Sequence, residues 1–208
     1  MHIEARQFTE WSRRIFPQAF HNKRCLDAGG GDINGCNKHL FSWDAEERFV
    51  CNDIGPAPNA TIVSATKDLT FEDGSFDTVV STECFEHDAQ YKESLRKIAD
   101  LLAPGGVLVF TCASTGRPEH GTRRTSPQDC WATRHKNVEF QDYYKNLTLH
   151  DVAEALDLDG IFERWVAYYH KRHKDLFFLG VKHGSSEPVP ELPLYLDKHT
   201  SLVGAGPE

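Results

Sequence analysis

A glycine-rich segment contains the residues best suited to hold a cofactor. Residues 25–35 read Cys-Leu-Asp-Ala-Gly-Gly-Gly-Asp-Ile-Asn-Gly, so an apolar run ends in an acid and breaks into glycines. This order is typical of a strand that passes through a tight loop into a helix. Because glycine lacks a Cβ, the backbone can approach a ligand closely, and the N–H groups that open the helix face it. The segment favours a cofactor-binding loop, although a glycine-rich stretch by itself also fits an ordinary turn.

An acidic residue closes the next expected strand. Phe49, Val50 and Cys51 form a short run of strand-prone residues, and Asn52 and Asp53 follow it. In a parallel sheet, an acid at this point reaches the ribose diol of a nucleotide cofactor. A nicotinamide dinucleotide site uses the same pair of features, so the glycine loop and Asp53 do not by themselves choose the chemistry.

Two later segments narrow the choice. Residues 68–81 read Asp-Leu-Thr-Phe-Glu-Asp-Gly-Ser-Phe-Asp-Thr-Val-Val-Ser, and Glu83, Glu86 and His87 follow them. Residues 102–110 read Leu-Ala-Pro-Gly-Gly-Val-Leu-Val-Phe.

With these four elements in this order and spacing, the chain resembles the class I S-adenosylmethionine-dependent methyltransferases, in particular the broad small-molecule group. The matching signature is D-x-G-x-G, an acid after the second strand, F-x-D-G-S-F-D with E-H, and L-x-P-G-G. The resemblance covers residues 22–112 and continues more weakly through residue 182. It implies a Rossmann-like α/β fold: a doubly wound, mostly parallel seven-stranded sheet with an antiparallel last strand and helices on both faces.

The resemblance also implies S-adenosyl-L-methionine as the cofactor and a set of residues that bind it. Asp27, Gly29 and Gly31 would surround the methionine part, Asp53 would hold the ribose, and Asp68 or its neighbours would meet the adenine. The full predicted set is Asp27, Ala28, Gly29, Gly31, Asp53, Ile54, Asp68, Leu69, Glu83 and His87. The chain departs from the family pattern at two positions, with Ile33 in place of a third glycine and Ala65 in place of an adenine-binding acid.

Residues 113–147 are the predicted substrate loop. They leave the carboxyl end of a central strand, which is the edge where open α/β sheets bind ligands. Their polar and aromatic side chains suit a hydroxylated acceptor such as a sugar ring, although lid packing and solvated arginines would give the same composition. The predicted substrate residues are Arg117, Glu119, Trp131, Tyr143 and Tyr144.

Methyl transfer to an alcohol requires removal of one proton, and a neutral imidazole suits that task. His120 is the first candidate base and His135 the second, with Asp142 either orienting the imidazole or acting itself. His87 is expected mainly to shape the pocket. The acids Glu83, Glu86, Asp88, Glu119 and Asp142 could supply oxygen ligands, but no fixed spacing supports a metal and none is assigned.

The pattern of apolar residues predicts the elements that position these groups. Phe8, Trp11 and Ile15 share a helical face, which predicts an N-terminal cap helix over residues 3–20. Further helices are expected around residues 95–102 and 148–157, and strands at 24–28, 48–52, 61–64, 77–81, 107–112, 161–170 and 175–182. We therefore predict one methyltransferase domain over residues 1–183, followed by a Pro/Gly-rich tail over residues 184–208.

Composition limits the partners. The chain has 208 residues and a net charge of −8, which argues against a nucleic-acid partner because such proteins usually present a basic face. The six cysteines form no C-x-x-C pair and are interpreted as reduced thiols. No leader and no membrane-spanning apolar run is evident, so a cytoplasmic protein without a membrane span is expected.

The sequence thus predicts a methyltransferase that O-methylates a sugar, a glycan or another small hydroxylated molecule. One alternative is a catalytically silent methyltransferase-like binding module, a domain of a larger glycan-modifying enzyme. Another is a methyltransferase for a phenol, a quinone or an amine. A nucleotide-dependent oxidoreductase would require NAD to bind in preference to S-adenosylmethionine.

Overall fold

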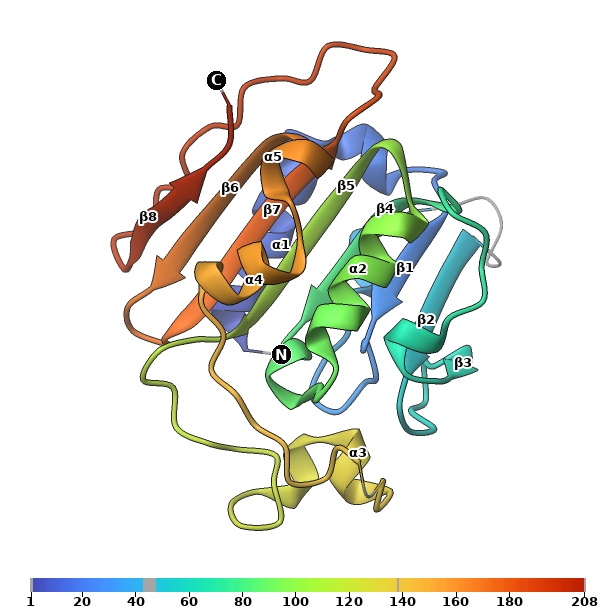
Figure 1. The fold of residues 1–208 in the computed structure, drawn as a ribbon, viewed down its shortest axis with the longest axis vertical. Helices are drawn as coiled ribbons and strands as arrows, with labels where there is room; N and C mark the ends of the chain where they lie inside the picture. The colour runs from blue at the N-terminus through green and yellow to red at the C-terminus, as the bar shows by residue number, and fades with distance from the viewer. Residues whose placement is uncertain (1, 43–47, 138, 208) are drawn as a thin grey trace.

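A computed structural model describes residues 2–42, 48–137 and 139–207. Residues 1, 43–47, 138 and 208, which fall within the predicted domain, substrate loop and tail, lie outside the described residues. The fold is built on an eight-stranded sheet of order β3-β2-β1-β4-β5-β7-β6-β8 (Figure 1). The strands are β1 (Cys25–Ala28), β2 (Phe49–Asp53), β3 (Ile62–Val63), β4 (Phe76–Thr82), β5 (Leu102–Ala113), β6 (Phe162–His170), β7 (Asp175–Lys182) and β8 (Thr200–Ala205).

The sheet is parallel from β1 to β5 and antiparallel beyond. β1 pairs with β2 and β4, β2 with β3, and β4 with β5, all in parallel. β7 pairs antiparallel with both β5 and β6. This is the predicted Rossmann-like fold.

Helices cover both faces of the sheet. Figure 1 shows α1 (Ile3–Ile15) behind the sheet and α2 (Tyr91–Leu101), α4 (Leu149–Ala155) and α5 (Leu158–Ile161) in front of it. The short helix α3 (Trp131–Arg134) lies away from both layers, in the segment that follows β5.

Two apolar cores lie on opposite faces, and β5 feeds both of them. Val107 and Val109 pack with the α1 side, whereas Leu108 and Phe110 pack with the side of α2 and α4. Successive side chains of a strand point to opposite faces, so a continuously apolar strand fills both cores. The strand predicted at 107–112 is confirmed as part of β5, and its side chains are buried on both faces of the sheet.

The predicted N-terminal helix is shorter than residues 3–20. α1 ends at Ile15, and a single 3-10 turn, Pro17–Phe20, follows it. Proline cannot donate the backbone hydrogen bond that a continuing helix needs, which explains the break after Phe16.

The sequence predicts that the glycine loop leads into a helix, but the described residues that follow the loop form no α-helix. Within the part of the chain described between β1 and β2, the loop is followed by a 3-10 turn, Lys38–Leu40. Glycine and asparagine are poor helix formers, and Asn37 is held by Asp27 instead. The loop conformation is therefore set by side-chain hydrogen bonds.

The sheet has one strand more than predicted, because residues 200–205 form β8 within the predicted tail. β8 pairs antiparallel with β6, from Val166 opposite Ala205 to His170 opposite Thr200. The strand is short and follows a proline-containing connection, so local sequence gives it little signal; its pairing with a strand distant in sequence supplies the order.

α4 lies within the helix predicted around residues 148–157, and its first residue follows Thr148 as the N-cap. The Thr148 side chain accepts from the Asp151 backbone N–H, and Asp151 accepts from the Thr148 backbone, which completes a capping box. Among the described residues, no helix combines the length and the apolar character needed to cross a bilayer.

Candidate functional site

A cavity of about 450 Å³ lies where the parallel strands end. Its walls come from the segments after β1, β2, β3, β4 and β5 and from the start of α1. Figure 1 shows α3 and its flanking loops beyond this edge of the sheet. The predicted site residues that line it are Gly29, Gly31, Asp53, Ile54, Glu83, His87, Arg117, Glu119, His120 and Trp131.

The glycine loop and Asp53 form one wall. The Gly31 N–H donates to Asp53 Oδ2 over 2.9 Å, and the Gly55 N–H donates to Oδ1 over 3.3 Å. Gly29 has φ +64°, a conformation that favours glycine, and a Cβ there would overlap Cys84. A Cβ on Gly31 would overlap Asp53 and the Trp131 indole, so the loop depends on bare backbone at both positions.

Asp27 supports this wall from behind and does not line the cavity. Its fully buried carboxylate accepts from the backbone N–H of Asn37 over 3.2 Å and from its side-chain Nδ2 over 2.9 Å. Burial raises the pKa of Asp27 to about 6. Asn37 does line the cavity, so Asp27 acts on the site by positioning Asn37.

Asn59 fixes the outer part of the loop. Its Oδ1 accepts from the Asp32 N–H and its Nδ2 donates to the Gly30 carbonyl, each over 2.6 Å. The glycine loop is thus attached at Asn37, at Asp53 and at Asn59, three points that local sequence does not reveal.

Several buried polar atoms on the walls find no hydrogen-bond partner within the described part of the chain. They are Asn37 Oδ1, Asn52 Oδ1, His87 Nδ1 and Trp131 Nε1. All four residues line the cavity. An unpaired buried polar group is costly, so these acceptors and donors fit a polar ligand such as the nucleoside and amino-acid parts of S-adenosylmethionine.

Glu83 joins the cavity to a buried charge cluster. Its φ of +54° is rare for a residue with a Cβ, and it is held there by the Thr111 hydroxyl, which donates to Oε1 over 2.9 Å. Burial alone would raise the pKa of Glu83, but His2 and Arg117 outweigh it and lower the pKa to about 2. Glu83 is therefore an anion on the cavity wall.

His2 and Asp175 complete this cluster, and sequence reasoning missed both. His2 Nε2 lies 2.9 Å from Asp175 Oδ2 and 3.3 Å from Glu83 Oε2, and Arg117 donates to Asp175 Oδ1 over 3.0 Å. Burial alone would lower the pKa of His2, but the two carboxylates raise it to about 10. No local motif marks His2, whereas Asp175, the first residue of a predicted strand, could have been noticed as a buried acid.

His87 and His120 face each other on another part of the wall. Their ring centroids are 4.9 Å apart with planes at 89°, and the Tyr144 ring packs against both. Burial, aided by the neighbouring His120, lowers the pKa of His87 to about 3, and burial also lowers the pKa of His120. Both imidazoles are therefore neutral at neutral pH.

Other predicted site residues lie off the cavity lining. Ala28 and Leu69 are buried in the core, and Asp68 is exposed and paired with Lys67 over 2.9 Å, while Ser64, Ala65 and Thr66 line the cavity nearby. The 3-10 turn Thr66–Asp68 after β3 leaves Asp68 exposed, so we do not expect its carboxylate to contact the adenine.

The remaining residues predicted for catalysis and substrate binding also lie outside the cavity lining. His135 is exposed and stacks on Trp131 at 5.1 Å. Asp142 forms an ion pair with Arg123 and so does not orient His120. Tyr144 packs behind the histidines and donates to the Pro118 carbonyl over 3.1 Å, while Tyr143 is half-buried outside the lining.

Solved structures share this fold. A Burkholderia thailandensis 1,6-didemethyltoxoflavin-N1-methyltransferase, with bound 1,6-didemethyltoxoflavin and S-adenosylhomocysteine, matches at TM-score 0.58 and 14% identity over 88% of this chain and 79% of that chain. Haemonchus contortus phosphoethanolamine N-methyltransferase 2 matches in its complex with phosphomonomethylethanolamine and S-adenosylhomocysteine, at TM-score 0.58 and 17% identity. It covers 86% of this chain, which spans 53% of that protein.

A second structure of the Haemonchus contortus enzyme, in complex with S-adenosyl-L-methionine, matches at TM-score 0.56 and 18% identity over 86% of this chain and 53% of that chain. At these identities the likeness shows the shared fold. A family model described as "Methyltransferase domain" matches residues 2–161, which is more than half of the chain. The chain therefore belongs to the methyltransferase-domain family, as the four sequence motifs indicated.

Proposed function

We propose that this protein is an S-adenosylmethionine-dependent methyltransferase that acts on a hydroxyl of a small polyhydroxylated molecule, with a sugar as the leading acceptor. The observation that carries the proposal is one cavity with two kinds of wall. Asp53 and the Gly31 backbone form a nucleotide-type wall, and the neutral His87–His120 pair forms a wall suited to an acceptor.

The residues present fit the cofactor. Gly29 and Gly31 let the loop backbone pack closely against Cys84 and Asp53 on the cavity wall. Asp53 offers a carboxylate at the end of β2, and Asn37 and Asn52 present acceptor oxygens without partners in the described structure. When bound, the cofactor supplies a methyl group already activated on a sulfonium. The protein's part is to position the acceptor, exclude water and handle one proton.

His120 is the group that we propose accepts that proton. Its Nδ1 lies 3.2 Å from the Pro118 carbonyl oxygen, which can only accept, so Nδ1 carries the hydrogen and Nε2 presents a lone pair. A neutral imidazole with a free lone pair suits removal of a hydroxyl proton near neutral pH. Tyr144 packs on the ring and shares the same carbonyl, which fixes its orientation.

The choice of a hydroxyl rather than an amine rests on this base. The structural neighbours named above are N-methyltransferases. A neutral amine attacks the methyl group with its own lone pair, so it does not need a base to remove a proton first. The neutral pair of buried His87 and half-buried His120, beside an anionic Glu83, is better matched to an acceptor that must lose a proton and make several hydrogen bonds. Arg117 and Glu119 add polar groups to the same wall.

Calorimetric titration with S-adenosylhomocysteine, and with NAD in parallel, tests the cofactor. Saturable binding of the first alone is expected, and failure of S-adenosylhomocysteine to bind would overturn the proposal. A labelled-methyl screen over sugars, phenols and amines then tests the acceptor, where product from amines alone would refute the hydroxyl assignment.

The base is tested by His120→Ala, with His135→Ala as the matched control because His135 is exposed and off the cavity lining. We expect about 100-fold lower turnover in the first variant, within the usual range for loss of a general base, and little change in the second. Both should bind S-adenosylhomocysteine as the wild type does. Unchanged turnover in His120→Ala would remove this histidine from the mechanism.

A further inference from the structure

Three potential metal ligands meet at the cavity wall. Glu86 and His87 lie in the 3-10 turn Phe85–His87 after β4, and His120 comes from the segment after β5. One carboxylate oxygen and one nitrogen of each imidazole all lie within 4.8 Å of one another. Ligand atoms bound to one ion at about 2.0–2.2 Å sit about 3–4 Å apart, so small side-chain shifts bring the three together.

The electron pairs of these groups are not used elsewhere. Glu86 is fully buried, and neither carboxylate oxygen has a hydrogen-bond partner among the described residues. Burial and the neighbouring Glu83 raise the pKa of this carboxyl well above its usual range, so a bound ion has to displace its proton. The Nδ1 of His87 is likewise unpaired within that part of the chain. The Nε2 of His120 presents a lone pair, because Nδ1 is bound to the Pro118 carbonyl.

We propose that Glu86, His87 and His120 bind one divalent transition-metal ion, such as Zn²⁺, at the acceptor wall of the cavity. A buried carboxyl with two unpaired oxygens is costly, and an ion removes that cost. One carboxylate and two imidazoles are a typical ligand set for such ions.

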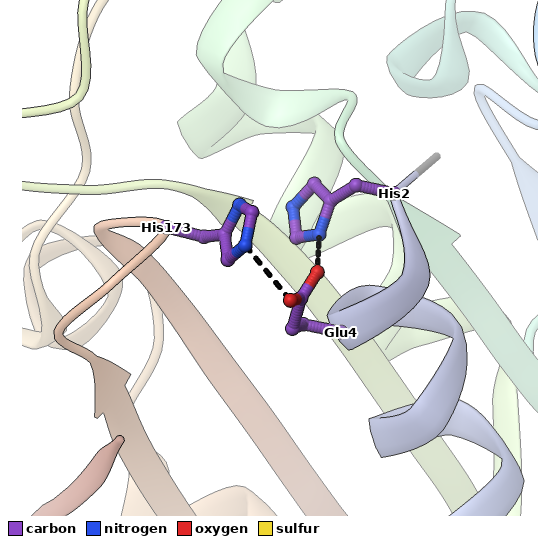
Figure 2. A group of neighbouring side chains, drawn as sticks. All are labelled: His2, Glu4 and His173. Carbon is purple, nitrogen blue, oxygen red and sulfur yellow. Dashed lines mark hydrogen bonds and ion pairs between the residues drawn. The ribbon is translucent and has the colours of Figure 1, made fainter.

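A neighbouring cluster of the same composition lacks these properties. Figure 2 shows His2 and His173 on either side of Glu4, which lies 3.2 Å from one ring and 2.8 Å from the other. Glu4 is thus already paired with both rings. The two rings stack at 4.8 Å with planes 15° apart, so their in-plane lone pairs do not converge on one point. The rings of His87 and His120 are perpendicular, which allows convergence.

The ion would leave coordination positions open toward the cavity, because His87 and His120 both line it. An oxygen of the acceptor is the natural ligand for such a position, and this role rests on the proposed function, whereas metal binding itself does not. With the ion bound, the Nε2 lone pair of His120 is donated to the metal and does not accept a proton, so the base role proposed above for His120 belongs to the metal-free protein.

The test uses the full chain, stripped with a chelator and dialysed against Zn²⁺. Metal content is measured by mass spectrometry, and Co²⁺ binding is followed by its visible absorption bands. We expect one equivalent of Zn²⁺ in the wild type and at least about 10-fold weaker binding in Glu86→Gln and in His120→Ala. Glu86→Gln is nearly isosteric and removes a buried acid, so it should fold.

The matched control is the double variant Glu4→Gln with His173→Ala, which removes the cluster of Figure 2 and should retain one equivalent of Zn²⁺. Absence of Zn²⁺ from the wild type, unchanged binding in Glu86→Gln, or loss of the ion in the control would each overturn the proposal. S-adenosylhomocysteine titration of every variant reports on the fold and the cofactor site separately. Failure of the proposed function would appear there, and failure of the metal site in the Zn²⁺ content.

Discussion

The backbone N–H of Gly31 donates to Oδ2 of Asp53 over 2.9 Å, so the loop after β1 is fastened to the end of β2. The two motif elements that the sequence placed on separate strands are therefore one structural unit. Asp53 is buried with its carboxylate held by two backbone N–H groups, which presets its orientation for a ligand.

This unit predicts the effect of adding one methyl group. Gly31→Ala would press a Cβ against Asp53 and Trp131, so we expect at least about 10-fold weaker S-adenosylhomocysteine binding, or about 1.4 kcal/mol. Gly74→Ala is the control, because Gly74 also has a positive φ of +72°, but the nearest atom that the added Cβ would meet among the described residues is 3.8 Å away. It should lower the melting temperature through backbone strain and leave affinity unchanged. Equal affinity in the two variants would contradict the role of the loop.

Asp27 should affect cofactor binding although it lies off the cavity lining. Both carboxylate oxygens of Asp27 accept hydrogen bonds from Asn37. Asp27→Asn replaces one of these oxygens with an NH₂ group, so one donor of Asn37 loses its acceptor and Asn37 shifts. We expect about 10-fold weaker S-adenosylhomocysteine binding by calorimetry, again about 1.4 kcal/mol. Asp68→Asn, at an exposed acid paired with Lys67, should bind as the wild type does. The opposite ranking would restore Asp68 to the cofactor site.

His2 should contribute stability that depends on pH in the alkaline range. It faces Glu4, Glu83 and Asp175, with His173 stacked on it, and its folded pKa is about 10 against an ordinary 6.5. A folded pKa above the unfolded value means that the contribution is complete below about pH 6.5 and disappears as pH rises through 10.

The measurement is urea unfolding of the wild type and of His2→Ala at several pH values. The difference in the free energy of unfolding should be constant at acidic pH, where His2 is charged in both states, and should shrink between pH 7 and 10. A difference that grew with pH would show that His2 is neutral in the folded protein.

The contribution of the α4 capping box to the free energy of unfolding should be measurable with one substitution. Thr148→Ala removes a side chain that accepts from the Asp151 N–H, and we expect a loss of about 1 kcal/mol in the free energy of unfolding. Glu154→Gln is the control, since its ion pair with Lys92 is exposed and should contribute almost nothing.

The same capping box predicts that the stability of the protein depends on pH in the acidic range. Burial alone would raise the pKa of Asp151, but hydrogen bonds from Lys145 and Thr148 lower it to about 2. A depressed folded pKa stabilises the protein above the ordinary value near 3.8, and the stabilisation is lost as pH falls through 2. The free energy of unfolding of Asp151→Asn should therefore change less between pH 5 and pH 2 than that of the wild type.

Sequence by itself determined the parts of this protein that depend on local pattern. The alternation of apolar runs and helical faces placed most strands and helices, because period and turn residues are read within a short window. The glycine loop, Asp53 and the two later motifs were sufficient to indicate the family, and the family match agrees.

Only the tertiary structure decided which side chains meet. His2 from the chain start and Asp175 from β7 reach Glu83 after β4, a contact between three segments that no local window contains. Packing also turned Asp27 toward Asn37, left Asp68 in solvent and enclosed Glu86 beside two histidines. The eighth strand is ordered by pairing with β6 rather than by its own propensity. Such contacts are set by how the sheet and its connecting loops pack, so residue type and spacing alone do not specify them.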